Sequence, residues 1–356
     1  MASGGFDIAI GNPPYVNATK VRKQYQVKGF ATAACPDIYA WCLERSATLL
    51  QPSGRTGMIV PLSLGFSGDF QSLRDALFSN YQANWFASFG RIPSALFNYD
   101  VRVRNTIHLA ARTSLTRASH TTLLHRWFDD AREYLFQSMS YAAFAPDVWD
   151  RKIPKFNTSR LAAAFEQNIN SSPRVREVLS KREAKGGALC FKKTAYNWLA
   201  FSKNPAPCQD AGGNEISQTQ LDELYPVDSL TSDILFLLLN GKLAFIYWCA
   251  LGDDFHVTKG TMGDFPFRLD FSDYLDMEVI KGLCKELRNA MKSAIQFKLN
   301  AGINVGTYNL AICREVTDRS DALLAGALSL SEVWEDIELY YSQVVRTDFS
   351  SDKTDD

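Results

Sequence analysis

The sequence predicts an α/β fold in which part of a parallel sheet comes first, followed by an α+β module and then by C-terminal helices. Three observations support this prediction. Short apolar runs alternate with helix-period segments over residues 6–117. Turn-forming residues are frequent over 118–230, where neither period is sustained. Helical patterning then returns from Ser229 onward.

The first predicted element is a buried strand at 6–10, Phe-Asp-Ile-Ala-Ile, which must stop before Pro13 and Pro14 because two prolines cannot continue a ladder. A helix is predicted over 37–50, where apolar residues recur at helical spacing at Ile38, Trp41, Cys42 and Leu49. Gln51-Pro52-Ser53-Gly54 is expected to end it.

The next predicted elements are a strand at 57–61, a helix at 70–79, and strands at 84–89 and 106–111. This alternation indicates a parallel sheet, whose ligands bind at the carboxyl ends of the strands. Later helices are predicted at 230–251, interrupted at Asn240-Gly241-Lys242, and at 277–299 and 331–345. The polar residues 348–356 are expected to fray. We therefore expect three parts, with bounds 1–117, 118–310 and 311–356.

Composition excludes several classes of protein. The 356 residues are 46% hydrophobic and 22% charged, with a net charge of −1, which argues against a disordered or fibrous chain. The seven cysteines are scattered without a C-x-x-C pair, so we expect neither a disulfide framework nor a metal site. With no signal-peptide pattern and no apolar run long enough for a membrane span, we expect a cytoplasmic protein without membrane association.

Basic and aromatic residues are interleaved between residues 151 and 203. This pattern suits a surface that follows phosphates and packs against bases. The alternative is a solvated charged face over an ordinary aromatic core. The residues expected to contact DNA are Arg151, Lys152, Lys181, Arg182, Lys192, Lys193 and Trp198.

The motif Asn12-Pro13-Pro14-Tyr15 follows the first predicted strand. The motif resembles the fourth motif of amino-methyltransferases that use S-adenosyl-L-methionine, which reads (D/N/S)-P-P-(Y/F/W) after a strand, and the resemblance implies methyl transfer to an exocyclic amine of a base. Such an amine is a poor nucleophile because its lone pair is delocalised into the purine ring. The Asn12 side-chain oxygen and the Pro13 carbonyl can both accept its N–H bonds, which favours a pyramidal nitrogen. The prolines hold that carbonyl in place, and Tyr15 offers an aromatic face for a base that has left the duplex. Alternatively, Pro-Pro-Tyr is only a strand-ending turn.

The segment 4–16 resembles motif IV of adenine-N6 DNA methyltransferases of the TaqI-like and Type IIG restriction–modification class. It reads Gly4-Gly-Phe-Asp-Ile-Ala-Ile-Gly-Asn-Pro-Pro-Tyr-Val16. The resemblance implies a Rossmann-like methyltransferase sheet, S-adenosyl-L-methionine as cofactor, and flipping of an adenine out of double-stranded DNA. It also implies that Asn12, Pro13, Pro14 and Tyr15 are catalytic, that Tyr15 and Phe97 contact the target base, and that Asn12 touches the cofactor.

Other segments carry the same resemblance in patches. These are Asp37-Ile38-Tyr39, Gly54–Pro61, Arg91–Phe97 with Val101–Arg104, and Phe255–Lys259 with Phe265-Pro266. The alternative to a contact between Phe97 and the target base is that Phe97 is an ordinary residue of the hydrophobic core. His256, taken alone, is interpreted as a core or turn histidine and not as a catalytic one.

The family's cofactor motif, F-x-G-x-G, is missing. No two of the 21 glycines are separated by a single residue. The sequence is therefore expected to represent the C-terminal half of the methyltransferase sheet with its recognition domain. The strand at 6–10 would then be an exposed apolar edge, and a separate N-terminal methyltransferase half is the expected partner.

The leading hypothesis is thus a nucleoid-associated component of a bacterial restriction–modification or phage-defence methyltransferase, incomplete or inactive alone. One alternative is a DNA-binding recognition fragment without catalysis. Another is an RNA or protein-glutamine N-methyltransferase, since glutamine methyltransferases also carry NPPY. The long chain after the motif favours a large polymeric substrate.

Overall fold

In the computed structural model, which describes residues 4–24, 26–97, 103–113 and 116–345, the chain divides into two units, Met1–Glu166 and Gln167–Asp356. The first unit is built on a six-stranded sheet with the order β1-β2-β4-β3-β5-β6. Its elements are β1 (Phe6–Gly11), α1 (Tyr39–Leu49), β2 (Leu50–Pro61), α2 (Gln71–Asn80), β3 (Ala83–Phe89), β4 (Asn105–Ala111), β5 (Ala118–His125) and β6 (Ala142–Ala143).

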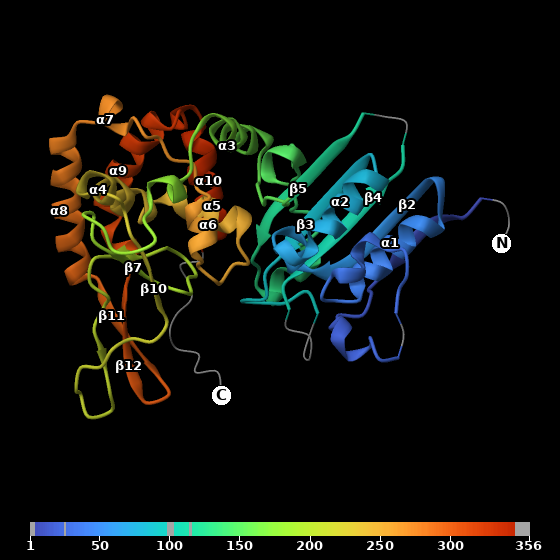
Figure 1. Cartoon of the computed structure of the whole chain (residues 1–356), viewed down its shortest axis with the longest axis horizontal. Helices are drawn as coiled ribbons and strands as arrows, with labels where there is room; N and C mark the ends of the chain where they lie inside the picture. Colours follow the sequence, from blue (N-terminus) through green and yellow to red (C-terminus); the bar gives the residue numbers. More distant parts are fainter. Residues whose placement is uncertain (1–3, 25, 98–102, 114–115, 346–356) are drawn as a thin grey trace. The chain divides into compact units, whose positions relative to one another are not determined.

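The predicted elements of this unit are confirmed in kind and order, but the strand at 6–10, which was expected to be buried, is largely exposed because it lies at the edge of the sheet. The helix expected to end at Gln51–Gly54 ends at Leu49, and those four residues are extended as part of β2. They form an irregularity in the pairing of β1 with β2, whose register jumps between Phe6 and Ile8. Helices α1 and α2 lie on the same face of the sheet (Figure 1), as expected for two successive right-handed crossovers.

The expectation of a purely parallel sheet is wrong. β4 pairs antiparallel with both β2 and β3, whereas β1 with β2 and β3 with β5 are parallel. The described residues between β3 and β4 form no helix, so the chain returns beside β3 without the crossover that a parallel neighbour needs. The sheet is therefore mixed.

The expected division at residue 117 also differs from the structure. β5 pairs with β3 and β6 pairs with β5, so residues 118–143 extend the first sheet and do not start a new module. Helix α3 (Ser159–Ser171) crosses the observed division between Glu166 and Gln167.

The second unit joins helices to two three-stranded sheets, ordered β10-β7-β8 and β11-β12-β9. Its strands are β7 (Leu189–Lys192), β8 (Phe201–Ser202), β9 (Cys208–Gln209), β10 (Leu221–Leu224), β11 (Ile295–Asn300) and β12 (Ile303–Tyr308). Its helices are α4 (Ser229–Leu239), α5 (Lys242–Leu251), α6 (Lys259–Gly263), α7 (Phe271–Tyr274), α8 (Met277–Ser293), α9 (Arg314–Ala327) and α10 (Trp334–Val344).

Helices α4 and α5 form the apolar centre of this unit, and every residue of α5 is buried. No single helix among the described residues is long and apolar enough to span a membrane. α4 and α5 reach that length and composition only as a pair bent by 69°.

The helix predicted over 277–299 ends at Ser293. Residues 295–300 instead form β11, which pairs with β12 as a hairpin around Ala301 and Gly302. Both turn residues have positive φ, and the apolar residues of β11 alternate with period two, which favours a strand. Helix α9 was not among the predicted helices, and the residues expected to fray lie outside the described part of the chain.

Candidate functional site

The NPPY segment lies where β1 ends at Gly11. Asn12 is exposed, Pro13 is buried, Pro14 is exposed and Tyr15 is half-buried. No residue from 12 to 16 continues the ladder, as expected when two prolines follow a strand. The side chain of Asn12 is therefore open to solvent at the carboxyl end of a strand, where α/β sheets bind their ligands.

Two hydrogen bonds fix the Tyr15 side chain. Its hydroxyl donates to the backbone oxygen of Ile59 in β2 (3.0 Å) and accepts from Asn105 Nδ2 in β4 (3.1 Å). Burial raises the pKa of Tyr15 to about 12, partly opposed by the hydrogen bond from Asn105. The phenol therefore remains neutral at physiological pH and connects the loop to two strands.

The loop also packs against the start of α1. The rings of Tyr15 and Tyr39 meet edge to face with centroids 6.5 Å apart, and Tyr39 stacks on Phe70 at 5.0 Å. The backbone N–H of Ile38 donates to the carbonyl of Val16 (3.0 Å). The structure thus brings the segment 37–39 beside the NPPY loop.

Asn105 is a residue of this site that sequence reasoning missed. It is fully buried at the start of β4, and its Oδ1 accepts no hydrogen bond from a described residue. The only available signal was a polar side chain at the start of an apolar strand. Its partner, Tyr15, is 90 positions away in sequence.

Phe97 lies half-buried in the connection between β3 and β4, and no ring contact joins it to Tyr15 in the part of the chain that the structure describes. Of the following segment, Val101 and Arg102 lie outside the described residues. A role for Phe97 at the target base remains a prediction.

The residues predicted to bind DNA belong to both units. Arg151 and Lys152 lie in the first, where Arg151 forms an ion pair with Asp147 (2.9 Å). Lys181, Arg182 and Lys193 are exposed in the second. Lys192 and Trp198 line one cavity there. Their contact with DNA remains a prediction.

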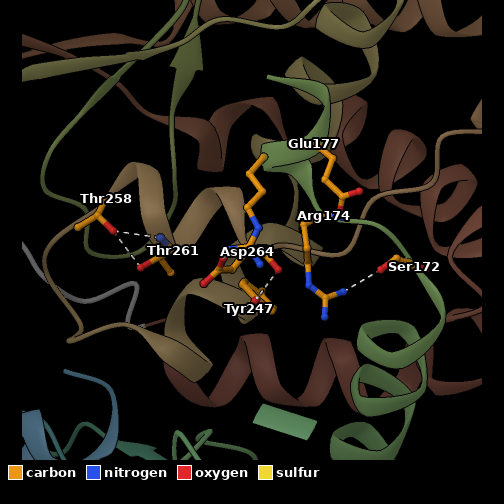
Figure 2. Close-up of polar contacts among 8 residues, drawn as sticks. Ser172, Arg174, Glu177, Tyr247, Thr258, Thr261 and Asp264 are labelled. Atoms are coloured by element: carbon orange, nitrogen blue, oxygen red, sulfur yellow. Dashed lines mark hydrogen bonds and ion pairs between the residues drawn. The ribbon is translucent and has the colours of Figure 1, made fainter. Parts of the chain in front are cut away.

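The segment 255–259 lies beside residues 193–195, where the backbone N–H of Val257 donates to Lys193 O (2.8 Å). The segment 265–266 lies beside a stretch that follows α3. The backbone N–H of Val175 donates to Phe265 O (3.0 Å), and Arg176 forms an ion pair with Asp264 (2.6 Å). Figure 2 shows the neighbouring contacts, in which the Tyr247 hydroxyl donates to Asp264 O (2.8 Å). These contacts give the region a structural role within the second unit.

His256 belongs to a turn, as interpreted from the sequence. Its Nδ1 lies 2.5 Å from Asp253 Oδ2, and its side chain is 60% exposed. Burial alone would raise the pKa of Asp253. Hydrogen bonds from the side chain and backbone of His256 and from the backbone of Phe255 outweigh that effect, so the pKa of Asp253 is lowered. Among the described residues, no cluster of three or more histidine, cysteine, aspartate or glutamate side chains could hold a metal ion.

The residues present do not complete a site for S-adenosyl-L-methionine. In the methyltransferase sheets that the sequence resembles, a glycine turn on a neighbouring strand would cradle the nucleotide part of the cofactor. The sequence contains no G-x-G, and β1 pairs with β2 alone among the described strands. The described residues beside Asn12 therefore include no glycine turn of this kind.

Comparison with known proteins finds similarity in the N-terminal segment of the chain. Residues 1–93 match the family model of the Eco57I restriction-modification methylase. A protein of Methanocaldococcus jannaschii, described as a type II restriction enzyme and methyltransferase, is 36% identical over 75 residues. That alignment covers 21% of this chain and 6% of the relative, so the matched stretch is a small part of the relative's length.

Solved structures of restriction–modification enzymes overlap the chain more loosely. The overlap with the Type IIL enzyme MmeI in complex with DNA spans 94% of this chain and 57% of the MmeI chain, with 11% identity and a TM-score of 0.45. The overlap with the DrdV–DNA complex spans 41% of this chain and 18% of the matched chain, with 16% identity and a TM-score of 0.31. At these TM-scores neither overlap carries a conclusion about this chain.

Proposed function

We propose that this chain is the catalytic-loop and recognition portion of a site-specific DNA adenine-N6 methyltransferase of a bacterial restriction–modification or phage-defence system. The observation that carries the proposal is the placement of Asn12-Pro13-Pro14-Tyr15 at the carboxyl end of β1, within the segment that matches the methylase family model. Methylases of this kind take their methyl group from S-adenosyl-L-methionine.

In this proposal, Asn12 Oδ1 and the Pro13 carbonyl accept the two N–H bonds of the target amine. The acceptors direct the nitrogen lone pair away from the purine ring, which makes the amine a better nucleophile. The Tyr15 hydroxyl stays hydrogen-bonded to Ile59 O and Asn105 Nδ2, which fixes the orientation of the ring. The ring can then stack on a base that has left the duplex. The proline rings keep the loop from rearranging when the base arrives.

The outer edge of β1 supports the proposal that further strands complete the sheet. β1 is the edge strand of the sheet, and the side chains of Phe6, Ile8 and Ile10, which share one face of it, are 59%, 64% and 83% exposed. Unpaired apolar edges attract another strand. We propose that the partner is a methyltransferase half that carries the glycine turn and most of the cofactor site.

A DNA-binding fragment without catalysis is the second candidate. The missing glycine turn favours it, because a chain without a cofactor could still read DNA. It predicts that loss of Asn12 leaves the methylation of DNA unchanged.

An allelic replacement in the source organism tests the proposal with every natural partner present. The strain carrying Asn12→Ala is compared with wild type by single-molecule sequencing of genomic DNA. We expect one sequence motif to lose N6-methyladenine throughout the genome. Asn17→Ala is the matched control, since Asn17 is an exposed asparagine five positions away that caps a 3-10 turn.

Unchanged adenine methylation would support the DNA-binding fragment. Loss of methylcytosine would contradict the adenine assignment. The completed-sheet proposal is tested separately by calorimetric titration of sinefungin into the purified chain. We expect no binding by the folded chain alone, and micromolar binding would contradict a shared cofactor site.

A further inference from the structure

The second unit contains a cavity of about 380 Å³ that the methyl-transfer proposal does not use. Its walls come from β7, the loop 193–200, β8 and the β11–β12 hairpin. Six aromatic residues line it: Phe191, Tyr196, Trp198, Phe201, Phe255 and Tyr308. The volume falls within the range of small-molecule sites. An aromatic lining of this kind favours a planar ligand.

Hydrogen bonds and ring contacts hold the aromatic walls in place. Trp198 Nε1 donates to the backbone oxygen of Tyr308 (3.0 Å), and the Tyr308 hydroxyl donates to the carbonyl of Asn204 (3.1 Å). The rings of Tyr196 and Phe255 meet edge to face at 6.3 Å. Walls that are already ordered lose little conformational entropy when a ligand enters.

The charged residues of the lining are all basic. Lys192 and Lys298 line the cavity, and no aspartate or glutamate does. Neither ammonium group makes an ion pair with a described residue. Burial lowers the pKa of the half-buried Lys192, so a bound anion would relieve the cost of its charge. The cavity is therefore suited to a ligand with a negative group.

Gln218 adds a polar group of fixed direction. Its Nε2 donates to the carbonyls of Ala206 (2.6 Å) and Gly306 (3.1 Å). Since carbonyl oxygens only accept, these two bonds set which end of the amide is nitrogen. The Oε1 atom accepts no hydrogen bond from a described residue and is left to accept one from an amino group.

We propose that this cavity binds a nucleotide, with the base against Trp198 and Tyr308, its amino edge at Gln218 Oε1, and its phosphate at Lys192 and Lys298. The nucleotide is either an unpaired residue of a DNA strand or a free nucleotide, since both present the same chemistry. This site is independent of the NPPY loop and needs no methyl donor.

Fluorescence of 2-aminopurine tests the proposal with the full chain and no S-adenosyl-L-methionine present. The probes are a single-stranded oligonucleotide with one 2-aminopurine, the free 2-aminopurine deoxynucleotide, and an abasic oligonucleotide as competitor. Stacking against the aromatic walls should quench the fluorescence saturably. The abasic strand should compete about tenfold more weakly than its base-bearing counterpart, because base stacking supplies affinity.

Three variants distinguish the cavity from the remaining surface. Ala200→Phe places a ring in the cavity without removing a contact, and it should weaken binding at least tenfold. Lys192→Ala and Lys298→Ala should each weaken binding several-fold, with the difference shrinking at high salt. Lys285→Ala is the charge-matched control, since Lys285 is exposed on α8 and does not line the cavity.

Quenching of the strand probe alone would assign the site to DNA, and quenching of the free nucleotide as well would assign it to a soluble nucleotide. Either supports the proposal. The absence of quenching with both probes would overturn it, and so would equal quenching in wild type and Ala200→Phe. The genomic methylation test does not depend on this cavity, so failure of one proposal leaves the other standing.

Discussion

The side-chain amide of Asn105 donates a hydrogen bond to the hydroxyl of Tyr15 over 3.1 Å, which ties the loop after β1 to the middle of the sheet. The same hydroxyl donates to Ile59 O, so a single oxygen joins three segments of the chain. Tyr15 is thus oriented by strands that lie far from it in sequence. The position of the NPPY loop depends on β4 as well as on its own prolines.

Tyr15→Phe should lower the free energy of unfolding by about 1–2 kcal/mol, because it leaves the buried Asn105 amide without its acceptor. A double-mutant cycle with Asn105→Ala, measured by urea unfolding, should give a coupling energy of about 1 kcal/mol. Tyr134→Phe is the control, since Tyr134 is 58% exposed. Additive effects of the two site variants would show that the hydrogen bond does not stabilise the loop.

Ile10→Lys should reduce self-association of the purified chain. Ile10 is 83% exposed on the edge strand β1, and a charged side chain on an edge strand opposes pairing with another strand. The variant should keep the thermal stability of wild type, since little apolar area is lost. Analytical ultracentrifugation over a range of concentrations measures the change.

Leu269→Lys serves as the control for Ile10→Lys, because Leu269 is an apolar residue 63% exposed in the second unit and outside any strand. Equal behaviour of the two variants would contradict an edge-specific association. A wild-type chain that remains monomeric at all concentrations would do the same.

The stability of the first unit should fall on acidification because of His108. This residue is completely buried, and its pKa is lowered to about 3. Its Nε2 is hydrogen-bonded to Asn84 Oδ1 (3.0 Å), whereas Nδ1 has no described partner. Protonation would therefore place a charged N–H in the core without an acceptor.

The sign follows from proton binding. The unfolded chain binds a proton at His108 near pH 6.5, whereas the folded chain does not until about pH 3. The stabilisation is thus complete above pH 6.5 and is lost as the pH falls toward 3. His108→Gln should flatten this dependence in urea unfolding between pH 4.5 and 7.5, and an unchanged slope would refute the assignment.

Gly241→Ala should destabilise the second unit by about 1–3 kcal/mol. A Cβ at this position would overlap Asp321 Oδ1 and lie 2.7 Å from its carboxyl carbon. Asp321 Oδ2 accepts a hydrogen bond from the backbone N–H of Lys242 at the start of α5 (2.8 Å), so the carboxylate cannot move without losing that contact. Burial raises the pKa of Asp321 to about 7.

Gly282→Ala is the matched variant, since Gly282 lies within α8 and nothing comes within 4 Å of an added Cβ. Alanine is the better helix former, so this variant should gain up to about 1 kcal/mol. Thermal unfolding compares the two. Similar melting temperatures would show that the contact at Asp321 is easily relaxed.

Local sequence patterns predicted the strand, helix and turn order of the first unit well. The apolar run at 6–10 followed by two prolines indicated both β1 and the loop after it. The helical spacing from Ile38 onward indicated α1. These features depend on residues close together in the chain, where propensity and periodicity act directly.

Residues close together in the chain are thus sufficient to place Asn12-Pro13-Pro14-Tyr15 at the end of a strand. The three-dimensional structure was needed to show that β4 lies antiparallel between β2 and β3, and hence that Asn105 contacts Tyr15. It also decided that residues 118–143 extend the first sheet and that Lys192 and Lys298 line one cavity. Pairings between residues so far apart depend on the packing of the whole unit, and no local period encodes them.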